Sequence, residues 1–287
     1  MSEFTNLVDG YGMPFQVPDS FTVDDLRKAI PKECFNRSAV RGLSYVARDI
    51  ILIIATFCIF QIWLSVDMIS SPFVRFTLWS MYGFLNGLFG TGLWVLAHEC
   101  GHHSFSTSVI LDDTVGFILH SSLLVPYFSW KISHRKHHKG TAHMKRDMVF
   151  VPRTREQHCE RFGIPTEKMH EIVGDTPLYA AYYIATRLLF GWPAYLLTND
   201  TGHDFHEGQP EERGRGKRNG LFTGVNHFNP SSPLFSAKDA QLIFLSNLGI
   251  LATAAVLYTL GSRYYGWGSL LKWYFVPYLW VNTWLGK

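Results

Sequence analysis

Two groups of histidines are the side chains of this sequence whose type and spacing can do chemistry. The first is HECGHH, residues 98 to 103, and the second is HRKHH, residues 134 to 138. Residues three or four apart share one face of a helix, so each group presents several imidazoles in one direction. Neutral imidazole binds iron, zinc and copper well. Five such side chains within about forty residues are more than a single zinc ion needs.

The predicted metal site has a defined set of ligands and neighbours. Its candidate ligands are His98, His102, His134, His137 and His138, with His103 as a sixth candidate. Glu99 lies between two of them, and we expect it to orient a histidine through the second ring nitrogen rather than to bind the metal itself. Asp147, Asp200 and Asp204 are weaker candidates for the same orienting role. For isolated histidines such as His120, packing or surface roles are expected.

HECGH also fits the zinc protease pattern HExxH, in which two histidines bind zinc and the glutamate acts as general base. A protease would need one more ligand at a single tetrahedral zinc, so the complete second group of histidines would remain unused. We therefore keep a membrane zinc protease as an alternative only.

The composition favours a membrane protein over a soluble enzyme. Of the 287 residues 47% are hydrophobic, 15% aromatic and only 17% charged. Uncharged runs predict four spans at about 50–66, 76–97, 242–262 and 273–286. The fourth has 14 residues before Lys287 and is predicted as a truncated span. Apolar segments at about 115–128 and 176–197 are predicted to be re-entrant or interfacial. The expected fold is all-α: a polytopic helical membrane protein.

The sequence predicts two regions along the chain. Residues 1–46 form a polar arm without the features of a signal peptide, and residues 47–287 form the membrane domain. In the arm, Thr22 followed by two acids predicts a helix start, and Pro31 predicts its end.

Orientation follows from the positive charges next to the spans. The arm is rich in Lys and Arg, and the segment 98–241 holds most of the remaining cations, whereas the loop 67–75 holds only Arg75. We therefore predict that the arm, both histidine groups and both termini face the cytosol. The four cysteines form no CxxC pair, which agrees with a reducing compartment. With a net charge of +3 and no nucleic-acid-binding motif, no nucleic acid partner is expected.

The histidine groups resemble those of the membrane fatty acid desaturases, and more narrowly of the fungal acyl-lipid delta-12 (oleate) desaturases. The family pattern is HxxxH, then HxxHH, then a C-terminal HxxHH. This sequence matches the first two, and further stretches such as HKGTAHMKRDMVFVPRTRE, WPAYLLTNDTGHDFHE and VNHFNPSSPLF look like the fungal group. The similarity runs from about Phe21 to Trp284.

The resemblance implies an oxidoreductase of unsaturated fatty acid biosynthesis. It implies two non-haem iron ions, O2 as co-substrate, and cytochrome b5 with its NADH reductase as electron donors. The substrates would be oleoyl chains of membrane phospholipids, converted to linoleoyl chains in the endoplasmic reticulum membrane, and homo-oligomers are compatible with it. A fatty-acyl hydroxylase of the same family and a non-catalytic membrane subunit are the alternatives.

Two departures from the family pattern bear on activity. His103 stands where the fungal enzymes often have glutamine. The C-terminal HxxHH is not among the 287 residues, and we do not take the HxxH formed by His203 and His206 as its replacement. The expectation is that this chain as written holds at most one iron well, desaturates nothing, and has a poorly anchored last helix.

The predicted orientation can be tested by glycosylation mapping. Acceptor sites introduced near Ser70, in the loop predicted to be lumenal, should be glycosylated in microsomes, whereas sites near Lys217 should not. A gel shift after expression with microsomes reports the result. Glycosylation near Lys217 but not near Ser70 would show that the orientation is opposite to the predicted one.

Overall fold

The computed structural model describes residues 20–64, 69–143, 146–152, 154–163, 165–166, 177–202 and 224–285. Every regular element within these ranges is a helix, so the predicted all-helical fold is confirmed. The chain divides into two compact units, Met1–Arg37 and Ser38–Lys287. The predicted boundary of the arm at residue 46 therefore falls inside a helix of the second unit.

The N-terminal unit contains α1 (Val23–Ala29) and the 3-10 turn η1 (Lys32–Phe35). The Thr22 hydroxyl accepts a hydrogen bond from the backbone N–H of Asp25, and the Asp25 carboxylate accepts one from the backbone N–H of Thr22. This reciprocal cap satisfies two donors that a helix start leaves open. Both the predicted start at Thr22 and the stop before Pro31 are confirmed.

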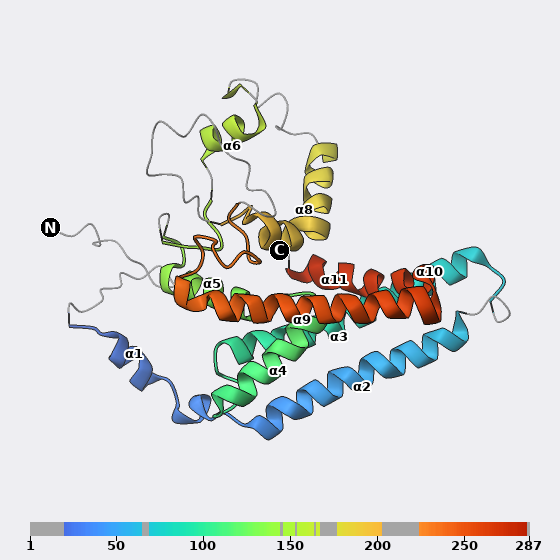
Figure 1. The fold of residues 1–287 in the computed structure, drawn as a ribbon, viewed down its shortest axis with the longest axis horizontal. Coiled ribbons are helices and arrows are strands. Elements are labelled where there is room, and N and C mark those ends of the chain that lie inside the picture. Colours follow the sequence, from blue (N-terminus) through green and yellow to red (C-terminus); the bar gives the residue numbers. More distant parts are fainter. Residues whose placement is uncertain are drawn as a thin grey trace, which may run out of the picture. The chain divides into compact units, whose positions relative to one another are not determined.

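The second unit carries the long helices (Figure 1). In chain order they are α2 (Ala39–Trp63), α3 (Pro72–Gly101), α4 (Val109–Ser122), α5 (Tyr127–Gly140), α6 (Arg155–Phe162), α8 (Pro177–Thr198), η4 (Ala237–Asp239), α9 (Ala240–Thr259), η5 (Leu260–Tyr265), α10 (Trp267–Leu270), η6 (Leu271–Phe275) and α11 (Val276–Leu285). The segments η5 and η6 are π-helical.

Two of the described helices are long and apolar enough to cross a membrane, namely Ala39–Trp63 and the continuous segment Ala237–Tyr265. They contain most of the first and third predicted spans. The second predicted span lies within α3, which has 30 residues but is not among the helices that pass by apolar composition. The predicted span 76–97 contains Asn86 and four glycines, which lower its mean hydropathy, so an uncharged run need not be a strongly apolar one.

The two shorter apolar segments form the helices around the histidines. Helices α4 and α5 are bent by 108° at a short break, and the predicted re-entrant segment 115–128 contains this bend. The chain therefore turns sharply before the helix that carries the second histidine group. Helix α8 covers the other predicted segment almost residue for residue.

Helix α11 packs closely against the glycines of α3. A Cβ atom added at Gly87 would lie 2.2 Å from the Cβ of Trp280, and one added at Gly83 would lie 2.8 Å from a methyl group of Val276. Small residues let two helix backbones approach in this way. This packing buries Val281 of α11, whereas the expectation of a helix poorly anchored in the membrane stays a prediction.

This packing predicts opposite effects of one substitution at two glycines. Gly87→Ala should destabilise the chain by about 2 kcal/mol or more, because Trp280 must move to admit the methyl group. Gly191→Ala in α8 meets no atom within 4 Å and should leave stability unchanged or raise it by up to about 1 kcal/mol. Thermal unfolding in detergent measures both, and equal effects would contradict the packing.

Candidate metal centre

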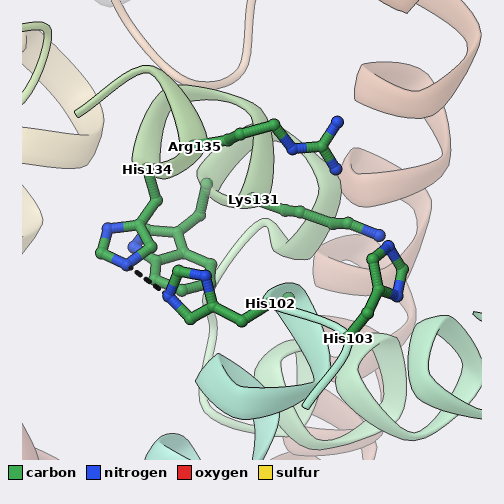
Figure 2. Close-up of a pocket in the computed structure, with 7 residues that line it drawn as sticks. His102, His103, Lys131, His134 and Arg135 are labelled. Atoms are coloured by element: carbon green, nitrogen blue, oxygen red, sulfur yellow. Dashed lines mark hydrogen bonds between the residues drawn. The ribbon is translucent and has the colours of Figure 1, made fainter. Parts of the chain in front are cut away.

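Four imidazoles from two helices meet at one point. His98 lies in the last turn of α3, and His102 is the residue that directly follows this helix. His134 and His138 lie on α5. One nitrogen of each lies within 4.8 Å of the corresponding nitrogens of the others. The Nε2 of His134 lies 2.9 Å from that of His98, 3.1 Å from that of His102 and 3.0 Å from that of His138. The dashed line in Figure 2 marks the contact between His102 and His134.

These distances suit a shared metal ion. Imidazole nitrogens bind first-row metals at about 2.0–2.1 Å, so adjacent ligand nitrogens around one ion are separated by about 3.0–3.4 Å. The contacts that join the four rings are 2.9 to 3.3 Å long. The structure thus brings four of the predicted ligands, His98, His102, His134 and His138, to one point. Imidazole ligands suit iron as well as zinc and copper.

Three of the four rings, those of His102, His134 and His138, are favoured in the uncharged form. Burial, followed by the neighbouring imidazoles, lowers the pKa of His134 to about 2. The same two causes lower the pKa values of His102 and His138 from their ordinary range. A metal ion therefore does not have to displace protons from these nitrogens at neutral pH.

The prediction for Glu99 agrees with its position. Its Oε1 lies 3.0 Å from Nδ1 of His98, whose Nε2 faces the other rings. Ser104 donates a hydrogen bond to the second carboxylate oxygen of Glu99. Burial opposes the ionisation of Glu99, but the hydrogen bonds from Ser104 and His98 outweigh it and lower its pKa. Glu99 thus contacts the ring nitrogen that the cluster leaves unused, which orients the ring.

His137 lies beside the cluster rather than in it. Its Nδ1 is 2.6 Å from Oδ1 of Asp147, and its ring centre is 5.7 Å from that of His138. Asp147 is buried and also accepts hydrogen bonds from the N–H groups of Val149 and Phe150. Burial would raise the pKa of Asp147, but these bonds and His137 lower it. Asp147 therefore has the predicted orienting contact, and the ligand role of His137 stays a prediction.

His103 turns away from the other histidines. It adopts a left-handed backbone conformation with φ of 57°, which ends α3 and redirects the chain. Its Nδ1 lies 3.6 Å from Oδ2 of the buried Asp112 on α4. Figure 2 shows His103 apart from His102 and His134, beside Lys131. The structure thus does not bring this sixth candidate ligand into the cluster.

Two of the remaining sequence candidates, Asp200 and His120, lie among the described residues, and neither belongs to the cluster. Asp200 pairs with Arg187, 2.8 Å away. His120 is buried with its ring centre 5.0 Å from that of Trp130, which confirms its predicted packing role. Asp204, His203 and His206 lie outside the described residues.

Helix α5 is held in place by residues that sequence reasoning missed. Its N-cap, Pro126, offers no side-chain hydrogen bond. Instead, the Ser246 hydroxyl of α9 accepts hydrogen bonds from the backbone N–H groups of Phe128 (3.0 Å) and Ser129 (3.4 Å). This cap comes from more than a hundred residues away in the sequence, so no local pattern could have predicted it.

A pocket of about 350 Å³ lies beside the cluster. It is lined by Gly101, His102, His103, Trp130, Lys131, His134 and Arg135 (Figure 2). Lys131 is buried and forms an ion pair with Asp113, which also accepts a hydrogen bond from the Tyr127 hydroxyl at 2.9 Å. From the sequence alone, a lysine so close to the basic HRKHH group would be expected to face solvent. Only the structure shows that Lys131 is buried and paired with Asp113.

The family model for fatty acid desaturases matches residues 77–286 of this chain. The chain belongs to the fatty acid desaturase family. It is 51% identical over 284 residues to an oleate hydroxylase of Claviceps purpurea, covering 99% of this chain and 59% of that protein. It is 40% identical over 279 residues to a delta-12 fatty acid desaturase of Mortierella isabellina, covering 94% of this chain and 64% of the relative.

A plant relative is also similar to nearly the whole of this chain but extends beyond it. The chain is 39% identical over 266 residues to an oleoyl-12-hydroxylase of Ricinus communis, with 92% of this chain and 61% of that protein covered. The chain thus spans about three fifths of the length of these relatives. The matched region of this desaturase-family chain contains both histidine groups, so the zinc protease alternative loses its support.

The lowered pKa values predict how stability depends on pH. His134 has a folded pKa of about 2 against 6.5 in its unperturbed state. Below about pH 6.5 the unfolded chain therefore binds protons that the folded chain does not, and stability falls as the pH falls. The melting temperature of the metal-free chain in detergent should decrease from about pH 7.5 to 5.5, and His134→Gln should make this decrease shallower. A melting temperature that rises over this range would contradict the neutral cluster.

Proposed function

We propose that this chain is the metal-binding part of an oxygen-dependent fatty-acyl desaturase that converts oleoyl to linoleoyl chains on membrane lipids. The observation that carries the proposal is the convergence of His98, His102, His134 and His138, with Nε2 contacts of 2.9 to 3.3 Å, inside the region matched by the desaturase family.

Iron is the metal that the proposed chemistry needs. The four clustered imidazoles would hold one iron ion, and His137, whose Nδ1 is taken by Asp147, has Nε2 left for a second. Bound iron together with O2 supplies the oxidising power to remove hydrogen from an unactivated methylene, which acid and base side chains lack. The C-terminal HxxHH of the family pattern, which is not among these 287 residues, would complete the ligand set.

The protein's own side chains position and insulate this centre. Trp130 stacks on His134 with ring centres 4.4 Å apart and planes 20° apart, which restricts the rotation of that ligand. Glu99 and Asp147 orient His98 and His137. Carboxylates that bind the free nitrogen of a metal-ligating imidazole fix its tautomer and orientation.

The electron donors, substrate and location are also part of the proposal. The sequence contains no nicotinamide or haem motif, which supports an external donor, cytochrome b5 with its NADH reductase. Phospholipid acyl chains are the substrates that fit a site at the end of apolar helices. The loop charges support an endoplasmic reticulum membrane protein with both termini in the cytosol.

Hydroxylation at the same position is the second candidate. It is favoured by the 51% identity to an oleate hydroxylase, against 40% to a delta-12 desaturase. Both reactions begin with the removal of hydrogen from one methylene group, and they differ in whether a second hydrogen is lost or oxygen is added. The non-catalytic membrane subunit stays the third candidate.

Product analysis in yeast tests the proposal. Residues 1–287 would be joined to the C-terminal part of the Mortierella isabellina desaturase that extends beyond the match, and expressed in a yeast without delta-12 activity. Linoleate is the expected product, and hydroxylated oleate would assign the second candidate. The 287 residues alone should give neither product.

His134→Ala in the same fusion is the matched control, because it removes one cluster ligand and should reduce product by at least about 100-fold. A different result is a fusion that inserts into the membrane and binds iron but makes neither product, while the intact Mortierella enzyme makes linoleate. This result would support the third candidate, a non-catalytic membrane subunit.

A further inference from the structure

A buried polar network contacts α5 on a different face from the one that carries His134 and His138. It consists of Ser133 on α5, Tyr195 on α8 and His227 in the segment 224–236. The Nε2 of His227 lies 3.0 Å from the Ser133 hydroxyl and 3.1 Å from the Tyr195 hydroxyl, and the two hydroxyls are 3.3 Å apart. Ser133 and His227 are fully buried, and Tyr195 is 4% exposed.

Such a network needs an explanation beyond packing. Burying a polar group costs free energy unless its hydrogen bonds are made. Apolar side chains of similar size would fill the same space without this desolvation cost. The network stays uncharged at physiological pH, since burial lowers the pKa of His227 to about 4. Its hydrogen bonds are directional, so they specify the orientation of the elements they join.

The network connects directly to a cluster ligand. Ser133 precedes His134 in the chain and donates a hydrogen bond of 3.0 Å to the carbonyl oxygen of Trp130. Trp130 in turn stacks on His134. A shift of Ser133 would therefore move both the helical turn that carries His134 and the indole that holds its ring.

The segment that carries His227 is itself tied down from three sides. The N–H of His227 donates to the carbonyl oxygen of Leu196 on α8 at 2.9 Å. The Asn247 amide of α9 donates to the carbonyl oxygen of Phe228 at 2.8 Å. The Lys136 ammonium of α5 donates to the carbonyl oxygen of Leu234 at 2.6 Å. His227 is thus presented to α5 by a rigid support.

We propose that His227 and Tyr195 are positioning residues for the second histidine group, which act through Ser133 to set the rotation of α5 about its axis. The inference rests on the proposed metal centre. A rotation of about 10° moves a side-chain end by about 1 Å, which exceeds the tolerance of about 0.5 Å for a preorganised site. His134 and His138 would then lose their common focus with the histidines of α3.

Metal binding by the purified chain tests the inference without requiring activity. Co²⁺ is the probe, because its visible absorption reports the ligand geometry as well as the affinity. Tyr195→Phe removes only the hydroxyl and should weaken Co²⁺ binding about fivefold, the equivalent of one hydrogen bond, and alter the visible spectrum. Ser133→Ala should act in the same direction.

A matched tyrosine separates positioning from stability. The Tyr82 hydroxyl is also buried and donates to the carbonyl oxygen of Trp273 at 2.9 Å, on α3 but far along the helix from the cluster. Tyr82→Phe should lower the melting temperature about as much as Tyr195→Phe, yet leave the Co²⁺ affinity and spectrum unchanged. His227→Gln retains a polar group towards Ser133 and should keep most of the Co²⁺ affinity. His227→Leu retains none and should weaken Co²⁺ binding.

Three results would overturn the inference. Unchanged Co²⁺ affinity and spectrum in both Tyr195→Phe and His227→Leu would show that the network does not position the ligands. Equal weakening by Tyr82→Phe and Tyr195→Phe would reduce its role to general stability. If the unsubstituted chain binds no Co²⁺, both the proposed metal centre and the positioning role fail. The first two results would instead leave the metal centre intact and overturn only the positioning role.

Discussion

Four imidazoles that meet at one point are the constraint on which the rest of this structure depends. One ring nitrogen of each lies within 4.8 Å of those of the others, and the Nε2 atoms of His98 and His134 are 2.9 Å apart. Without a metal this arrangement has little intrinsic attraction, so it must be imposed by the helices that carry the rings. The end of α3 and the middle of α5 must therefore be held beside each other by interactions elsewhere.

Those interactions come from all the helices around α5. The 108° bend between α4 and α5 returns the chain to the end of α3, and Ser246 of α9 supplies the cap that α5 lacks. Tyr195 of α8 and His227 of the segment before α9 contact a different face of α5. Helix α11 packs against the glycines of α3, the helix that carries the other two cluster histidines. The ligand geometry is thus a property of the whole helical unit and not of either histidine group alone.

The imidazoles, with Glu99 and Asp147 behind them, form a donor set that fits a metal ion. In the proposed function, this metal would supply the oxidising chemistry and the position of the acyl chain would decide the product. Relatives named as desaturases and as hydroxylases both match this chain over most of its length. If the proposed function holds, the choice between losing a second hydrogen and gaining oxygen depends on how the acyl chain lies against the metal centre, because small changes in position decide which atoms react.

The sequence by itself determined the helical class and the candidate ligands, because spacing along a helix and uncharged length are local properties that survive without a fold. The resemblance of its histidine groups to those of the desaturases also indicated the family. It also placed Glu99 and Asp147 as orienting residues, since both lie close in sequence to the histidines they contact. Only the tertiary structure decided that His103 turns towards Asp112 and that His137 pairs beside the cluster, because the direction of a ring after a helix end depends on a backbone angle. The supports of α5 were likewise invisible in the sequence: Ser246, Tyr195 and His227 lie between about sixty and more than a hundred residues from their partners, and a single hydroxyl or imidazole acquires such a role only from the helix that the fold places opposite it.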